Sequence, residues 1–204
     1  MSVFEIISKA NITEYLWNES LGSLSIIADE LEGITYYRII KKVGELKKRT
    51  VVTDSGIIYD FLRIARIMHL ENGIKQAFNN PFYAEEKVDS YNVRVVKVQG
   101  HVFAFTRGGY VCPFSTDRLV DFFDYDSFFK ENPNLIVCGE IAGHKNPYNA
   151  ESPPYVTEDA NFFVFDIRTK SGEQEISVEK RYKLFDEYKL PTVTRFGSYT
   201  PSDI

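Results

Sequence analysis

The chain has 204 residues, of which 44% are hydrophobic and 15% aromatic, and its formal net charge is −5 at pH 7. A chain of this length and composition can bury one large core or two small ones, so it is predicted to be globular. The modest negative charge argues against a protein that coats nucleic acid over its whole surface. Any phosphate-binding surface must therefore be a local basic patch.

Cysteine usage and hydropathy indicate the compartment. Cys112 and Cys138 each lie in an apolar stretch and form neither a C-x-x-C pair nor a disulfide framework, which predicts a reducing setting. No apolar run reaches the length of a membrane helix, and the N-terminus lacks the basic start and apolar block of a secretory signal. We therefore expect a soluble cytoplasmic protein that has no contact with a membrane.

The first part of the chain mixes helical and strand patterns. Residues 1–32 predict a helix-containing segment, and the β-branched and aromatic stretches 34–42 and 50–61 predict strands or a hairpin. Residues 62–78 have apolar side chains near helical spacing. The charged stretch EEKVDSYNVR, residues 85–94, reads as a strand. We expect an N-terminal segment with short strands over 1–60 and a second domain over 61–204.

The second part begins with two alternating apolar runs, 91–98 and 101–106, which predict a β-hairpin across Gln99-Gly100. Residues 118–130 predict one amphipathic helix. The apolar stretches 135–143 and 161–168 predict strands that a polar, proline-rich loop separates. A helix over 178–190 and a last strand over 192–199 follow. This mixture predicts an α+β fold with mainly antiparallel sheets flanked by helices.

Several polar residues near expected strand ends are candidates for chemistry. Lys87 lies between acidic residues, where a surface ion pair is the default interpretation. Arg107 precedes two glycines, and its planar guanidinium suits phosphate or carboxylate. Glu140 follows a buried strand, so it needs a hydroxyl, a cation, a metal or a structural ion pair as its partner. None of the three histidines has a neighbour at metal-ligand spacing, so we expect no zinc site.

Aromatic residues alternate along the stretch NFFVFDIR. Strand geometry places Phe163 and Phe165 on one face and Asp166 on the other. Such rings are most often part of a core, but a ring that lines a pocket can also stack on a purine base. The sequence pattern leaves both interpretations open.

In chain order, Lys87-x-Asp89 with Arg94, then TRGG (106–109), GE (139–140) and FVFDI (163–167) resemble the covalent nucleotidyltransferases, namely polynucleotide ligases and mRNA capping enzymes. The longer strings EEKVDSYNVR, FTRGGYVCPFSTDR, GEIAG with NPYNAESPPYVTEDANFFVFDIR, and RFGSY are similar to the archaeal ATP-dependent RNA ligases that act as homodimers and circularise RNA. The resemblance runs from about residue 31 to the C-terminus. It implies the nucleotidyltransferase fold of these enzymes, which is similar to ATP-grasp.

The resemblance also implies roles for individual residues. Lys87 would attack the α-phosphorus of ATP and hold AMP, which then passes to an RNA 5′-phosphate, with ATP and Mg²⁺ as cofactors. A lysine amine attacks only when neutral, and desolvation or nearby positive charge favours that form. Glu140 would bind the ribose hydroxyls or the metal, and Phe165, or else Phe163, would stack on adenine. The nucleotide-binding residues implied are Glu86, Lys87, Asn92, Arg94, Arg107, Glu140, Phe163 and Phe165.

Two departures from the family pattern bear on activity. Ser90 stands where the family has glycine, which would cost about 1 kcal/mol if the backbone there needs a positive φ. The E-G-[IV]-V strand, the later lysine motif and the dimerisation domain of the family are not found after RFGSY. We therefore expect an incomplete, truncated nucleotidyltransferase domain that is monomeric and adenylylates itself weakly or not at all. The alternatives are a non-catalytic nucleotide- or RNA-binding module, a subunit that a second polypeptide completes, and a structural protein.

Overall fold

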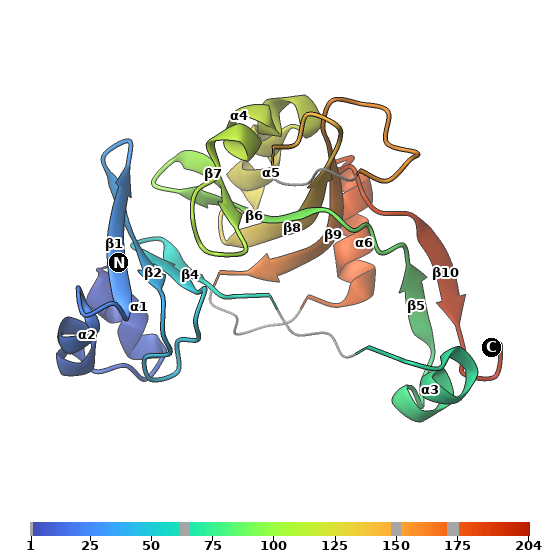
Figure 1. The fold of residues 1–204 in the computed structure, drawn as a ribbon, viewed down its shortest axis with the longest axis horizontal. Coiled ribbons are helices and arrows are strands. Elements are labelled where there is room, and N and C mark those ends of the chain that lie inside the picture. The colour runs from blue at the N-terminus through green and yellow to red at the C-terminus, as the bar shows by residue number, and fades with distance from the viewer. Residues whose placement is uncertain (1, 62–65, 148–151, 171–175) are drawn as a thin grey trace.

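The computed structural model describes residues 2–61, 66–147, 152–170 and 176–204. The described strands form three antiparallel sheets with helices around them, so the expected α+β fold with antiparallel sheets is confirmed. Figure 1 shows a central sheet with a smaller sheet on one side and a two-stranded ribbon on the other. The proposed division of the chain at residue 60 stays a prediction.

The N-terminal part folds as two short helices and a four-stranded sheet in the order β1-β2-β3-β4. Ser2 and Thr13 cap the two helices by accepting hydrogen bonds from backbone N–H groups, as polar N-cap residues commonly do. Trp17 lies in the apolar core between these helices and the sheet. The elements are α1 (Val3–Lys9), α2 (Glu14–Ser20), β1 (Ile26–Leu31), β2 (Ile34–Ile39), β3 (Val51–Thr53) and β4 (Gly56–Ile58).

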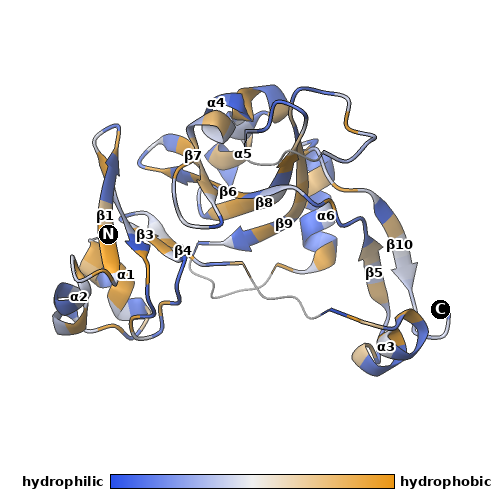
Figure 2. Cartoon of the chain, in the orientation of Figure 1, coloured by the Kyte–Doolittle hydropathy of each residue, from blue (hydrophilic) through white to orange (hydrophobic). Residues whose placement is uncertain are grey.

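The central sheet has the strand order β7-β6-β8-β9. The predicted hairpin over 91–106 and both predicted apolar strands are confirmed. One face of the sheet packs against three helices in a core rich in phenylalanine, and Figure 2 shows hydrophobic residues along β8. The elements are β6 (Tyr91–Val98), β7 (His101–Thr106), α4 (Pro113–Phe122), α5 (Tyr125–Glu131), β8 (Leu135–Ala142), β9 (Asn161–Thr169) and α6 (Val178–Glu187).

The remaining elements form a small outlying unit beside the central sheet. The ribbon pairs β5 (Phe82–Glu85) with β10 (Arg195–Tyr199), which confirms the predicted last strand. Helix α3 (Leu70–Ala77) lies next to this ribbon in Figure 1. The helix predicted over 62–78 is therefore shorter than expected, and residues 62–65 lie outside the described residues.

Two expectations about single elements are wrong. The helix predicted over 118–130 is two helices, because Phe123 is extended and Asp124 starts a new helix by accepting a hydrogen bond from the Ser127 N–H. The charged stretch 85–94 is not one strand, since β5 ends at Glu85 and β6 begins at Tyr91. The chain leaves the ribbon for the central sheet there, so residues 86–90 belong to neither ladder.

The face of the central sheet opposite the three helices packs against the N-terminal sheet. Tyr36 of β2 meets Phe105 of β7 edge to face, with 5.4 Å between ring centroids. Val51 and Ile58 lie in the same apolar cluster, together with Val96 of β6. This contact fixes the N-terminal sheet relative to the strands that carry most of the predicted site residues.

Candidate functional site

The segment 86–90 connects the ribbon to the central sheet and carries Lys87. Its conformation is fixed on both sides of the lysine. The backbone N–H of Glu86 donates to the Thr194 carbonyl at 2.8 Å, and the Glu86 carboxylate accepts hydrogen bonds from the hydroxyls of Thr194 and Tyr155. These hydrogen bonds lower the pKa of Glu86, with the Thr194 hydroxyl as the first cause. Val88 is buried on the other side, so Lys87 is held between two anchored residues.

Lys87 itself projects into solvent. Its side chain is 77% exposed, and its Nζ lies 3.1 Å from Oδ1 of Asp89, which is also exposed. This is the surface ion pair that an isolated lysine is expected to form. Attack by the Lys87 amine requires a ligand that displaces Asp89 from it and excludes water.

A buried carboxylate and amide lie on the adjoining strands. Asn92 of β6 and Glu140 of β8 are register partners, and Asn92 Nδ2 donates to Glu140 Oε1 at 2.9 Å. Glu140 Oε2 and Asn92 Oδ1 are both buried without a hydrogen-bond partner. An unpaired buried acceptor costs free energy, so this pair of oxygens suits a ligand that donates hydrogen bonds or carries positive charge.

The charge on Glu140 connects it to the other candidates. Burial raises the pKa of Glu140 to about 7, while the Asn92 hydrogen bond and the positive charges of Lys87 and Arg107 act in the opposite direction. The negative charge of Asp89 raises the pKa further. Lys87, Asp89, Arg107 and Glu140 therefore share one electrostatic neighbourhood, although they come from three separate segments.

The side chain of Ser90 is accommodated without backbone strain. Its φ is not positive, so the strain considered for a residue in place of glycine is not present. Its hydroxyl donates to the Ile141 carbonyl at 2.5 Å. Ser90 thus joins the Lys87 segment to β8 at Ile141, the residue that follows Glu140.

The two candidate stacking residues lie on the expected face of β9. Phe163 and Phe165 are partly buried and pack against a small cluster that contains Val88, Val156 and Val193. Val88 follows Lys87 directly, so the rings lie beside the lysine segment. Asp166 forms an ion pair with Arg181 of α6 at 3.3 Å. Phe165 also packs against the apolar cluster between the two sheets, with its ring centroid 6.1 Å from that of Phe61, whereas Phe163 packs against the Val88 cluster alone.

Arg107 lies at the exposed turn that follows β7. The Thr106 hydroxyl accepts hydrogen bonds from the Gly108 and Tyr110 N–H groups at 3.1 and 3.2 Å, which closes the turn. Gly109 has φ 87°, and a Cβ there would come within 3.0 Å of Val51 of the N-terminal sheet. The glycine geometry and the internal hydrogen bonds therefore fix the backbone of the turn that carries Arg107.

The structure does not bring Arg94 into this group. Arg94 is 1% exposed, and its two Nη atoms donate to the carbonyls of Arg49, Ile58, Tyr59 and Thr106 at 2.7–3.3 Å. Its Nε is buried without a partner. These contacts join β6 to the N-terminal sheet. Arg94 therefore has a structural role that the resemblance did not indicate.

Some residues of the site carry no recognisable sequence pattern. Tyr155 and Thr194 hold Glu86 from 69 and 108 residues away, and the sequence implied no role for either of them. Arg38 of β2 lies over the ring of Tyr110, with its Cζ 3.8 Å from the ring centroid, and so packs on the Arg107 turn. Tyr110 and Tyr155 each lie in a string that resembles the archaeal RNA ligases, but the resemblance implied no role for either side chain.

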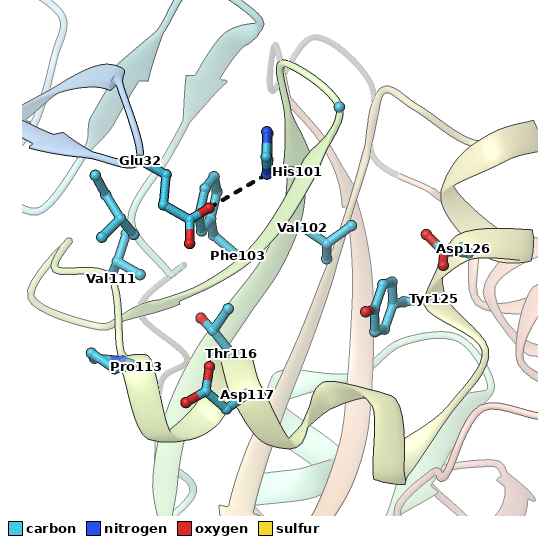
Figure 3. Close-up of a pocket in the computed structure, with 12 residues that line it drawn as sticks. Glu32, His101, Val102, Phe103, Val111, Pro113, Thr116, Asp117, Tyr125 and Asp126 are labelled. Carbon is cyan, nitrogen blue, oxygen red and sulfur yellow. Dashed lines mark ion pairs between the residues drawn. The ribbon is translucent and has the colours of Figure 1, made fainter.

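A separate cleft of about 340 Å³ does not suit a nucleotide. Figure 3 shows that it lies between the turn joining β1 and β2, strand β7 and helix α4. Its lining includes the carboxylates of Glu32, Asp117 and Asp126, and Glu32 pairs with His101 at 3.4 Å. Three carboxylates repel phosphate, so the Lys87 region is the better candidate for phosphate chemistry.

The described residues offer few groups for metal or disulfide chemistry. Nowhere in the described parts of the chain do three or more His, Cys, Asp or Glu side chains gather at a metal-binding distance. The residue that fits a cation best is Glu140, because its free oxygen is buried and unpaired. Cys112 and Cys138 are both free and buried, which confirms that they do not pair. Among the described residues, no helix has the length and hydropathy needed to cross a membrane.

Comparison with known protein families shows the family to which the chain belongs. A family model described as RNA ligase matches residues 80–203, which include every candidate site residue named above from Glu86 to Thr194. The chain belongs to the RNA ligase family. Its nucleotidyltransferase fold is thereby confirmed, together with the predicted resemblance to polynucleotide ligases.

This RNA ligase family member is similar to several known proteins. An archaeal ATP-dependent RNA ligase superimposes with a TM-score of 0.88 at 32% identity, over 100% of this chain and 55% of that one. A protein named "Putative ATP-dependent DNA ligase from Aquifex aeolicus" gives a TM-score of 0.85 at 39% identity, over 94% of this chain and 52% of that one. The uncharacterized protein MJ0414 of Methanocaldococcus jannaschii is 28% identical over 93% of this chain and 49% of its own length.

The RNA ligase family member thus spans about half the length of these relatives. The region that matches the family model, residues 80–203, contains the central sheet and the ribbon but not the N-terminal sheet. A monomeric state, a second polypeptide and a cytoplasmic location are tested by none of these comparisons and stay predictions.

A pH-dependent stability should result from Glu140. Because its pKa is raised to about 7, the native state holds a proton that the unfolded state releases near pH 4.5. Stability should therefore be highest below about pH 5 and should fall as the pH rises towards 7, with a total loss of about 2 to 3 kcal/mol. Glu140→Gln should remove this decrease. Urea unfolding of both proteins between pH 5 and 8 measures it.

The control for this measurement is Glu187→Gln, the same substitution at an exposed position on α6. Its stability should follow that of the wild type at every pH. Parallel profiles for the wild type and Glu140→Gln would show that Glu140 is not responsible for the decrease.

Proposed function

We propose that the chain provides the nucleotide-binding and AMP-accepting part of an ATP-dependent RNA ligase, with Lys87 as the AMP acceptor. In this reaction Lys87 Nζ forms a bond to the α-phosphorus of ATP, and the bond from that phosphorus to the departing pyrophosphate breaks. The amine loses its proton in the process. AMP then passes to an RNA 5′-phosphate, and an RNA 3′-hydroxyl displaces it to join the two ends.

One observation supports this proposal more than any other. The exposed amine of Lys87 lies in the same electrostatic neighbourhood as Arg107 and the buried, unpaired oxygen of Glu140. A ribose hydroxyl that donates a hydrogen bond to Glu140 Oε2 would give that oxygen a partner. The Arg107 guanidinium is available to bind the phosphates. A base placed against Phe163 or Phe165 would complete the contacts of a nucleotide.

Binding of ATP would also prepare Lys87 for attack. The triphosphate would compete with Asp89 for the ammonium group, and a bound nucleotide would cover an amine that is now 77% exposed. Loss of water favours the neutral amine, and the positive charges of Arg107 and of a bound divalent cation would offset the negative charge of the triphosphate, which favours the protonated form. The anchored residues on either side, Glu86 and Val88, keep the lysine in place during this exchange.

Base recognition would fall to the Glu86 segment. The Glu86 carboxylate is held by Thr194 and Tyr155, and its backbone is tied to the Thr194 carbonyl. A fixed acceptor of this kind suits the exocyclic amino group of adenine, which donates hydrogen bonds. Glu86, before the lysine, would therefore contact the base. The residues after the lysine, including Asp89, would lie near the phosphates.

A divalent cation fits this site only in part. The RNA ligase of Naegleria gruberi, which shares the fold at a TM-score of 0.53 and 16% identity, has been solved with AMP and Mn. In the present chain, Glu140 is the described residue that suits a cation, with Mg²⁺ as the proposed ion. When bound, such an ion would offset the negative charge of the phosphates and of the departing pyrophosphate.

The proposal is tested by incubation with ATP labelled at the α-phosphate and either Mg²⁺ or Mn²⁺. The chain is assayed alone and together with the part of the archaeal RNA ligase that this chain does not cover. We expect covalent label that is lost in acid, as for a phosphoramide, and that peptide mass spectrometry places in residues 86–90. Label in only the mixture would indicate a site completed by the added part.

The absence of label under both conditions would overturn the ligase proposal. If ATP still bound, as measured by calorimetry, the chain would be a non-catalytic nucleotide-binding module. The exposed Lys87–Asp89 ion pair is the observation that favours this second function, because the amine is paired with a carboxylate and lies in solvent. Loss of ATP binding as well would remove both proposals.

A further inference from the structure

The connection between β2 and β3 carries an unusual concentration of positive charge. Residues 41–49, which we call the basic loop, read KKVGELKKR and contain five basic residues against one glutamate. The whole chain has a net charge of −5, so this loop is a local exception to an acidic protein. A basic patch of this kind is the electrostatic footprint of a phosphate-binding surface.

The basic loop has a fixed conformation. Val43 and Leu46 are 4% and 0% exposed, and their backbones exchange two hydrogen bonds of 3.0 and 2.9 Å. Gly44 between them has φ 51°, and a Cβ there would come within 3.1 Å of Ile12 in the N-terminal core. The loop is therefore anchored by its apolar residues. Its four lysines are all exposed: Lys41, Lys42, Lys47 and Lys48.

These lysines have no acidic partners in the described parts of the chain. The salt bridge formed by the basic loop there joins Arg49 to Asp60, at the long distance of 3.9 Å. Like charges held close together on a fixed scaffold repel one another, which costs folding free energy. A polyanion that binds across the loop would relieve this repulsion, and the polyanion would release its own condensed counterions.

The basic loop is also connected to the strand that carries Asn92. Arg49 has φ 74°, a left-handed conformation that is uncommon for residues other than glycine and tends to mark functional sites. In this conformation its carbonyl accepts hydrogen bonds from both Nη atoms of Arg94, each at 3.3 Å. Arg94 lies two residues after Asn92 on β6. The loop is thus held in a fixed position relative to the proposed nucleotide site.

We propose that the basic loop binds the phosphodiester backbone of the RNA substrate while the Lys87 site holds the nucleotide. This inference rests on the proposed function, because it assumes that the chain acts on RNA. A membrane surface is a weaker candidate. The apolar residues of the loop, Val43 and Leu46, are buried, so it has no side chains to insert among lipid tails. The loop would contribute affinity without base specificity, because phosphate contacts carry no sequence information.

Charge reversal within the basic loop tests the proposal. Two variants, Lys41→Glu/Lys42→Glu and Lys47→Glu/Lys48→Glu, are compared with Lys180→Glu/Lys183→Glu, which changes two exposed lysines of α6 and alters net charge equally. Binding of a short 5′-phosphorylated single-stranded RNA is measured by fluorescence anisotropy at several salt concentrations. ATP binding is measured by calorimetry on the same proteins.

Each loop variant should bind the RNA about tenfold or more weakly than the wild type, because two of its lysines can no longer pair with phosphates. The slope of log K against log salt should become shallower by about 1.4, since each lysine–phosphate pair on a single strand accounts for about 0.7 of the slope. The α6 variant should bind RNA nearly as well as the wild type. ATP affinity should be the same in all four proteins, since none of these lysines touches the nucleotide site.

The possible failures are distinguishable. Equal RNA binding by the loop and α6 variants, or no RNA binding by a wild type that binds ATP, would overturn the role of the basic loop and leave the nucleotide site standing. A wild type that binds no ATP would overturn the proposed function instead. If the loop variants lose binding to anionic lipid vesicles while RNA binding is unchanged, the surface is a membrane contact and the proposal is wrong.

Discussion

Replacement of Lys87 by alanine should abolish covalent labelling by ATP while ATP binding is nearly unchanged. The amine is the group that would form the bond to phosphorus, and alanine offers no nucleophile in its place. Binding should survive, because Glu86, Glu140 and Arg107 remain. Lys87→Arg should also take up no label, since a guanidinium stays protonated even where an amine does not. Radiolabel transfer and calorimetry, run on the same preparations, separate the two effects.

The control for this prediction is Lys145→Ala. Lys145 is 62% exposed and its Nζ lies 2.6 Å from Asp159, so it is another exposed lysine in an ion pair with an aspartate. This variant should be labelled as fully as the wild type. Persistent label on Lys87→Ala would show that a different residue accepts AMP, and the peptide that carries the label would identify it.

The elements that were predicted correctly share strong local patterns. The hairpin of β6 and β7 has two alternating apolar runs on either side of Gln99-Gly100, and each of β8 and β9 is a mainly apolar stretch between polar loops. Such patterns depend on neighbouring residues only, so the sequence contains them in full. The motifs containing Lys87, Arg107 and Glu140 were recognisable for the same reason.

The elements that were missed depend on contacts between distant segments. The charged stretch 85–94 has the composition of a strand, but the chain changes sheets within it, which its local pattern does not reveal. The anchoring of Glu86 by Tyr155 and Thr194 likewise requires the folded chain. Asp124 did carry a local cue, because an aspartate after the aromatic pair Phe122-Phe123 is a possible helix N-cap.

Arg94 has contacts within the fold that its motif does not indicate. The motif suggests that an arginine seven residues after the lysine meets the nucleotide. In the structure its guanidinium is buried and donates to carbonyls from three separate segments. Burial lowers its pKa to about 10, which still leaves it charged at neutral pH. A charged donor shared among several carbonyls is expected to contribute more to stability than a single neutral hydrogen bond.

Arg94→Met should therefore lower the free energy of unfolding by about 3 to 5 kcal/mol. Methionine fills much of the same volume but removes the charged donor that the carbonyls of Ile58, Tyr59 and Thr106 share. Urea unfolding measures the loss. Arg118→Met is the control, because Arg118 forms an i,i+3 ion pair with Asp121 on α4 and should contribute less than about 1 kcal/mol. A loss of that small size at Arg94 would contradict the structural role.

The same variant distinguishes structural support from nucleotide binding. A ligand stabilises a protein according to its affinity for the native state, so ATP should raise the unfolding free energy of the wild type and of Arg94→Met by equal amounts if Arg94 only joins the two sheets. A smaller gain in the variant would mean that Arg94 also contributes to the nucleotide site, directly or by holding Asn92 and the Arg107 turn. Arg107→Ala provides the comparison, because it should reduce the gain from ATP while the stability of the free protein stays nearly constant.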